Sequence, residues 1–232
     1  MKSKAVRIAI DAAQSVSGRL DLPANPIACF VMAHGAGAGM DHPFMASVAS
    51  GLVARDIAAL RYQFVYMENG SRRPDRPALA HAAVRAAVDA AASLLPGVPL
   101  VAGGKSFGAR MTSQAQAEAP LPNVHGLAFV GFPLHPTAKP AVERAAHLAE
   151  VSVPMLFLQG ARDKLAELPL LEPVVASLGQ RATLRIFPDA DHSFHVPVRS
   201  GRTDAQTMAE LLDALAAWIG QVASRRPASA RR

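Results

Sequence analysis

The sequence predicts an α/β fold: one mostly parallel sheet covered by helices on both faces. Short apolar runs alternate with helical patterns along nearly the whole chain, as expected when parallel strands are joined by crossover helices. The chain has 232 residues, half of them hydrophobic. This length suits one α/β domain with a sizeable core. We therefore expect a single domain over residues 1–223, followed by a disordered basic tail over residues 224–232.

Eight strands are expected from the apolar runs. The first two flank a short turn and predict an antiparallel opening, whereas residues 27–33 are apolar throughout, which is typical of a strand buried on both faces. The expected strands cover residues 4–10, 15–22, 27–33, 57–64, 100–102, 125–132, 153–159 and 182–187.

The helices are expected from apolar spacing and from residues that favour helix ends. Pro43 suits a first helical position, and Phe44, Val48 and Leu52 then recur every four residues. Asp204 is expected to cap the last helix. Residues 65–77 are polar and aperiodic, so a long connection is expected there. The expected helices begin near 43, 77, 109, 141, 168 and 204.

Charge and composition argue against several classes of function. Four of the six net positive charges come from arginines in the last eight residues, so the rest of the chain carries only +2. Aromatic residues make up 5%, whereas a nucleic-acid surface would need basic residues on one face with aromatics to stack bases. The start of the chain lacks the apolar segment of a signal peptide, and no apolar run reaches the roughly 18 residues of a membrane span. We expect a cytoplasmic protein without a nucleic-acid or membrane partner.

The segment that carries chemistry is Gly104-Lys-Ser-Phe-Gly108. It has the form G-x-S-x-G between a strand and a helix, the context of a nucleophile elbow. Such a sharp turn needs residues without side chains two positions before and after the serine, and Gly104 and Gly108 meet this need. A phosphate-binding loop is a poorer interpretation, because the first glycine of that pattern would fall on Pro99.

Polar residues follow two later strands of the predicted sheet. Asp163 lies just after the strand that ends near 159, and His192 just after the one that ends near 187. The carboxyl ends of parallel strands carry the ligand site in such sheets. Together with Ser106 they give the chain order Ser, Asp, His, which is the order of α/β-hydrolases.

On these motifs the chain resembles the α/β-hydrolase superfamily from about residue 4 to residue 222. The string from Gly104 to Met111 is most similar to the small, lidless, dienelactone-hydrolase-like bacterial branch. The resemblance implies the α/β-hydrolase fold, an eight-stranded sheet whose second strand is antiparallel. The segment between Phe132 and Val153 is long enough for a flap but not for a large lid.

Acyl-transfer chemistry assigns a role to each residue. Ser106 is the expected nucleophile and His192 its base, and Asp163 is expected to orient the imidazole. The oxyanion hole is expected to use the N–H of Phe107 and a second N–H from the loop 34–39, with Ala36 preferred and Gly37 next. No metal or cofactor is expected, because the residues around His34, Asp41 and His42 lack the spacing and the third separate donor of a metal site.

Alternatives remain open for each assignment. His195 competes with His192 as the base, and Asp189, Asp191 and Glu167 compete with Asp163 as the acid. His34 is expected to hold its own loop. Substrate contacts are expected from Lys105, Arg110, Arg72 and Arg73, although all four could simply be solvated surface residues.

The sequence therefore predicts a serine hydrolase of the carboxylesterase or thioesterase kind. Its partner would be a small-molecule ester or thioester of small to medium size, and the oligomeric state is left open. An acyltransferase or peptidase could use the same three residues, because they determine the acyl-enzyme and not its acceptor. A catalytically idle scaffold for protein contacts is the alternative from another class.

Overall fold

The computed structural model describes residues 2–224 and contains one eight-stranded sheet. The strand order is β1-β2-β4-β3-β5-β6-β7-β8, with β1 and β2 antiparallel to their neighbours and the remaining pairs parallel. The predicted fold is thus confirmed, including the antiparallel second strand. The basic tail expected over 224–232 lies, apart from Ser224, outside the described residues.

The strands follow the apolar runs closely. β3 and β4 are buried at every position, because helices cover both faces of the central strands. β5 runs three residues beyond its apolar run, since the backbone of Gly103, Gly104 and Lys105 continues the pairing with β6. The strands are β1 (Lys2–Ala9), β2 (Ser15–Leu22), β3 (Ala28–Ala33), β4 (Ile57–Tyr62), β5 (Leu100–Lys105), β6 (Val124–Val130), β7 (Met155–Gly160) and β8 (Ala182–Phe187).

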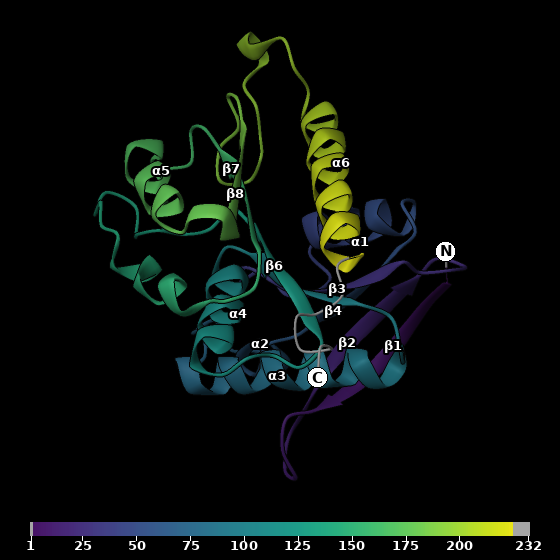
Figure 1. Cartoon of the computed structure of the whole chain (residues 1–232). Helices are drawn as coiled ribbons and strands as arrows, with labels where there is room; N and C mark the ends of the chain where they lie inside the picture. Colours follow the sequence, from purple (N-terminus) through teal and green to yellow (C-terminus); the bar gives the residue numbers. More distant parts are fainter. Residues whose placement is uncertain (1, 225–232) are drawn as a thin grey trace.

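The helices form a layer on each face of the sheet. Helices α1 (Pro43–Val53) and α6 (Asp204–Ala223) pack on one face, where Leu52, Leu211 and Leu215 join the core. The other face is covered by α3 (Pro77–Leu94), α4 (Phe107–Glu118) and α5 (Leu168–Ser177). Figure 1 shows α1 and α6 together on one side of the strands and α3 and α4 on the other.

Three local expectations are corrected by the structure. Residues 65–77 are not entirely irregular, because Val65–Glu68 form the short helix α2. The segment 141–150 contains a 3₁₀ helix, η1 (Glu143–Glu150), in place of an α-helix. The cap of α6 is Thr203 and not Asp204: the Thr203 side chain accepts from the Gln206 N–H, and the Gln206 side chain accepts from the Thr203 N–H.

Segments outside the core layers are short. Between β6 and β7 the chain contains only η1, so the site at the carboxyl ends of the strands has no large lid. Two further 3₁₀ turns occur near β8: η2 (Gly179–Arg181) directly precedes it, and η3 (Val198–Ser200) lies within the long connection from β8 to α6. Over residues 2–224, none of the helices has the length and hydropathy that crossing a bilayer would require.

Candidate functional site

Ser106 occupies the turn between β5 and α4. Its backbone lies at φ 51° and ψ −113°, a region that non-glycine residues rarely adopt, and such a conformation costs on the order of 1–3 kcal/mol. A Cβ at Gly104 or Gly108 would collide with the Ala33 carbonyl of β3; for Gly108 the separation would be 2.5 Å. The glycines therefore let the turn pack directly against β3, as expected from the sequence.

Three side chains from separate strand ends form a continuous hydrogen-bonded chain. The His192 Nε2 lies 2.9 Å from the Ser106 Oγ, and the His192 Nδ1 lies 2.6 Å from the Asp163 Oδ2. A carboxylate can only accept, so Nδ1 carries the proton and Nε2 is left to accept from the serine hydroxyl. Ser106 and His192 are 86 residues apart in sequence. The sheet brings them together because both follow the carboxyl end of a parallel strand.

The carboxylate of Asp163 is fully buried and held by two further donors. The Gln159 Nε2 donates to the same Oδ2, and the Leu165 N–H donates to Oδ1. Gln159 is itself fixed, because its Oε1 accepts from the Phe132 N–H. The sequence analysis missed Gln159; the signal for it is an amide at the end of the otherwise apolar strand β7.

The competing residues have other partners. His195 is exposed, and its Nδ1 pairs with Asp204 at 2.8 Å. Asp191 accepts from the N–H groups of Ser193 and His195 and so shapes the turn that carries His192. Glu167 pairs with the His135 ring.

The donors expected for an oxyanion differ in availability. The Phe107 N–H is at the first residue of α4 and lacks an intrahelical acceptor. Among residues 2–224 the Ala36 N–H has no hydrogen-bond acceptor, whereas the Gly37 N–H donates to the Tyr66 hydroxyl at 2.9 Å. The expectation for Gly37 is thus corrected, because its N–H is already engaged.

His34 fixes the peptide that carries the Ala36 N–H. Its Nδ1 donates to the Gly35 carbonyl at 2.7 Å, and its Nε2 accepts from the Phe64 N–H. Burial lowers the pKa of His34 to about 4, so the ring is neutral as this pair of bonds requires. In a trans peptide the N–H points opposite to the carbonyl. The Ala36 N–H is therefore directed away from His34.

A cavity of about 490 Å³ opens beside Ser106. Its walls are mostly apolar, and its few polar groups include His192 and Lys105. The lining residues are Gly35, Ala36, Ala38, His42, Phe44, Met45, Lys105, Ser106, Leu165, His192 and Ser193. The volume is within the range of small-molecule sites.

The structure does not bring the three predicted arginines into this cavity. Arg72 and Arg73 are exposed on the connection between α2 and α3. The Arg110 guanidinium lies 5.9 Å from the Phe107 ring, and burial, followed by the nearby Arg144, lowers its pKa. None of the three is among the cavity-lining residues.

A second serine–histidine pair joins Ser113, inside α4, to His147 in η1. The Ser113 Oγ is 2.7 Å from the His147 Nε2. Ser113 is fully buried, and the pair does not line the cavity beside Ser106.

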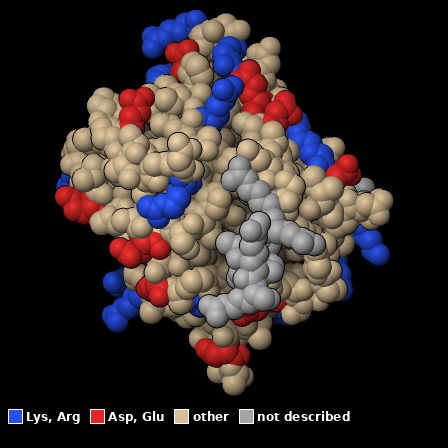
Figure 2. Space-filling model, viewed as in Figure 1, with Lys and Arg blue, Asp and Glu red and all other residues tan. Residues whose placement is uncertain are grey.

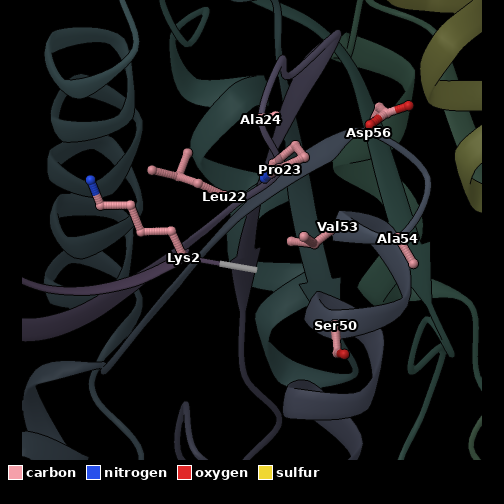
Figure 3. A pocket seen from close by; sticks show the side chains of 8 residues that line it. All are labelled: Lys2, Leu22, Pro23, Ala24, Ser50, Val53, Ala54 and Asp56. Atoms are coloured by element: carbon pink, nitrogen blue, oxygen red, sulfur yellow. The ribbon is translucent and has the colours of Figure 1, made fainter.

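Another surface hollow, of about 860 Å³, lies near the end of β2 and the beginning of β4. It is thus at the amino ends of the parallel strands, opposite to the ends that carry Ser106 and His192. Figure 3 shows that the charged groups of Lys2 and Asp56 point away from each other there. Its residues are Lys2, Leu22, Pro23, Ala24, Ser50, Val53, Ala54 and Asp56. This set contains no histidine or cysteine, and its polar groups do not converge as those of a catalytic site do.

Within the described residues, no group of three or more His, Cys, Asp or Glu side chains is arranged to hold a metal ion. On the face seen in Figure 2, basic and acidic side chains are interspersed and form no large area of one sign.

Comparison with known proteins agrees with this architecture. The chain superposes on a dienelactone hydrolase from Anabaena variabilis with a TM-score of 0.74 and 20% identity, covering 94% of this chain and 96% of that one. For a lidless α/β serine hydrolase from Xanthomonas campestris the values are 0.71 and 19%, with 98% of both chains covered. An esterase domain from Rhodothermus marinus gives 0.72 and 17%, covering 95% of this chain and 99% of that one. The family model described as "Alpha/beta hydrolase domain" matches residues 26–220. The chain therefore belongs to the alpha/beta hydrolase domain family.

Proposed function

We propose that this protein is a serine hydrolase that acts on small to medium esters or thioesters. One observation carries the proposal: the hydrogen-bonded chain from Asp163 through His192 to Ser106 ends beside an apolar cavity. Family membership supports hydrolysis, since the similar solved structures include an esterase domain and a dienelactone hydrolase.

In the first step Ser106 is the nucleophile. The His192 Nε2 takes the hydroxyl proton while Oγ attacks the carbonyl carbon of the substrate. The Asp163 carboxylate keeps the ring in the required tautomer and stabilises its charged form. The tetrahedral intermediate collapses when the protonated His192 gives its proton to the leaving alcohol or thiol, which leaves an acyl group on Ser106.

In the second step water releases the acyl group. The His192 Nε2 takes a proton from water, and the hydroxide attacks the acyl carbonyl. When the second intermediate collapses, the proton returns to the Ser106 Oγ and the carboxylic acid departs. In both steps the negative oxygen would be bound by the N–H groups of Phe107 and Ala36, and one such donor is worth about 3 kcal/mol in the transition state.

The cavity indicates the class of substrate. Phe44, Met45 and Leu165 give it apolar walls, and Ala36 and Ala38 leave room beside Ser106. A compact apolar acyl or alcohol group fits this lining. The absence of a large lid between β6 and β7 leaves the site accessible to soluble substrates without an interfacial opening step.

A fluorophosphonate probe tests the proposal, because it reacts covalently only with an activated serine. We expect labelling of the wild type and of Ser113→Ala, and at least 1,000-fold slower labelling of Ser106→Ala, on the order of the losses seen when a nucleophile is removed. Ser113→Ala is the matched control, since it removes a serine that also contacts a histidine. Failure of the wild type to label would support an idle scaffold. Equal labelling of Ser106→Ala would contradict the assignment of Ser106, because the activated serine would then be another residue.

A panel of p-nitrophenyl esters of increasing acyl length then tests the substrate class. We expect kcat/KM to be highest for short to medium chains and to fall for chains that exceed the cavity.

A further inference from the structure

Lys105 makes a contact that the proposed mechanism does not use. It is the last residue of β5 and directly precedes Ser106. Its Nζ donates to the main-chain carbonyl of His192 at 2.7 Å. One side chain therefore links the strand that carries the proposed nucleophile to the loop that carries the proposed base.

The surroundings of Lys105 hold its ammonium group in place. Nζ lies 5.9 Å from the centre of the Phe44 ring and 5.8 Å from that of Phe194. It also passes close to Gly131, where a Cβ would come within 2.9 Å of Nζ. Aromatic faces attract cations at such distances. The ammonium is thereby directed to the His192 carbonyl.

The cost of keeping a cation at this place argues that it is needed. Burial lowers the pKa of Lys105 to about 8, and the negative charges of Asp163 and Asp191 only partly oppose this effect. A methionine would fill the same space without desolvating a charge. Lys105 is partly buried, and a titratable group with a strongly shifted pKa beside a cleft is more often functional than an ordinary surface group.

The other backbone hydrogen bonds of the loop that carries His192 are made by the neighbours of His192, such as Asp191 N–H to the His195 carbonyl and Phe194 N–H to the Asp191 carbonyl. Asp191 holds the N–H groups of Ser193 and His195, and Phe194 has a positive φ of 63°. Among the described residues, the His192 carbonyl has no hydrogen-bond donor besides Lys105.

We propose that Lys105 is a positioning residue that fixes the His192 backbone and thereby keeps the imidazole within reach of the Ser106 hydroxyl. The inference rests on the proposed function, because it concerns the same three residues. Lys105 also lines the cavity beside Ser106, so the substrate contact predicted from the sequence remains a separate prediction. A small misplacement of a catalytic group costs up to about 100-fold in rate.

The test compares Lys105→Met with Lys105→Arg, and uses Lys139→Met at an exposed loop position as the matched control. For Lys105→Met we expect kcat on p-nitrophenyl butyrate to fall by about 10- to 100-fold, with KM within about twofold, because the positioning acts on chemistry rather than on binding. Lys105→Arg retains a charged donor and is expected to recover part of the loss. Lys139→Met is expected to match the wild type.

The pH profile gives a readout that a merely structural residue would not change. Burial lowers the pKa of Lys105 to about 8, and a neutral amine is a weaker donor than an ammonium. In the wild type we expect kcat to decline severalfold as the pH rises through 8. Asp163, Asp191 and His192 are the titratable groups that face Lys105. The decline should be absent in Lys105→Met and in Lys105→Arg, because a guanidinium remains charged.

A structural readout separates this inference from the proposed function. The His192 Nδ1–H that bonds to Asp163 gives a downfield proton signal in NMR, which Asp163→Asn identifies by its loss. We expect this signal to broaden or vanish in Lys105→Met while the melting temperature stays within about 4 °C of the wild type. An unchanged signal together with unchanged kcat would overturn the inference. A wild type that fails to label with fluorophosphonate would instead overturn the proposed function, and the NMR comparison would still decide the role of Lys105.

Discussion

Two serine–histidine pairs involve helix α4, with Ser106 at its N-cap and Ser113 in its interior, and they differ in the arrangement of their protons. In both the Oγ lies within hydrogen-bond distance of Nε2: 2.9 Å for Ser106 and His192, and 2.7 Å for Ser113 and His147. The distance alone would favour the second pair. The two pairs differ in which group accepts the serine hydroxyl proton and in the hydrogen-bond partners of the histidine ring.

The Ser113 hydroxyl donates its only proton to a backbone carbonyl. It donates to the Arg110 carbonyl one turn earlier at 2.9 Å. The His147 Nε2 must then be the donor to the Ser113 Oγ, since a hydroxyl has a single proton. Burial, followed by the positive charges of Arg110 and His81, lowers the pKa of His147 to about 4. Such a ring is neither oriented nor basic enough to activate Ser113.

The Ser106 hydroxyl is in the opposite situation. Its backbone at φ 51° places it at the tip of the elbow rather than inside a helical turn. The Asp163 carboxylate accepts the Nδ1–H of His192, so Nε2 faces the Ser106 hydroxyl as an acceptor. The two pairs therefore differ in the third group: a carboxylate holds the Nδ1–H of His192 in the first pair, whereas a backbone carbonyl accepts the serine proton in the second.

The largest expected effect comes from removing that third group. Asp163→Asn keeps the shape of the side chain but lets the amide stabilise the wrong tautomer of His192, and kcat should fall by about 10,000-fold. The change is measured by ester hydrolysis at saturating substrate. Glu167→Gln, which alters the carboxylate paired with His135, is the control and should lose little activity. Equal activity of Asp163→Asn and the wild type would contradict the assignment of the acid.

A smaller effect is expected when His147 of the second pair is replaced, and the quantity that changes is the free energy of unfolding. The folded-state pKa of His147 is about 4, below the ordinary value of 6.5. The unfolded chain therefore binds more protons between these values, and stability is lost as the pH falls from 6.5 towards 4. His147→Gln should reduce that loss by about 1 kcal/mol, after allowance for partial solvent exposure. Urea unfolding at pH 7 and pH 5 measures it.

His34 titrates in the same range and is present in both proteins, so the difference between wild type and His147→Gln isolates the contribution of His147. Ester hydrolysis at pH 7 should be the same in the two. A large loss of kcat in His147→Gln would show that the two pairs are not as different as their geometry indicates.

The smallest effect is expected from the arginines outside the cavity. Arg72 and Arg73 are exposed on the α2–α3 connection, so the double change to Gln should alter kcat/KM by less than about twofold, as expected for solvated surface charges. Neutral and anionic esters should be compared side by side. A fall in kcat/KM on the anionic ester alone would show that these arginines contact the substrate.

Much of the fold was predictable because local patterns report it. Apolar runs marked the strands to within a few residues, and proline placed the start of α1. The spacing of Thr203 and Gln206 is that of a capping box, so the sequence also contains the signal for the cap that the structure shows in place of Asp204. The helix α2 has only four residues, too few for periodicity to show.

The sequence by itself determined the elbow, the order of the three proposed catalytic residues and the strand ends on which they lie. These follow from spacing along the chain, because glycine requirements and strand periodicity are local properties. Only the tertiary structure decided that His192 rather than His195 contacts Ser106, that the Gly37 N–H is engaged by Tyr66, and that Lys105 turns to the His192 carbonyl. Such contacts join segments tens of residues apart, and they depend on how the strands are ordered in the sheet and how the loops after them fold, which no local pattern encodes.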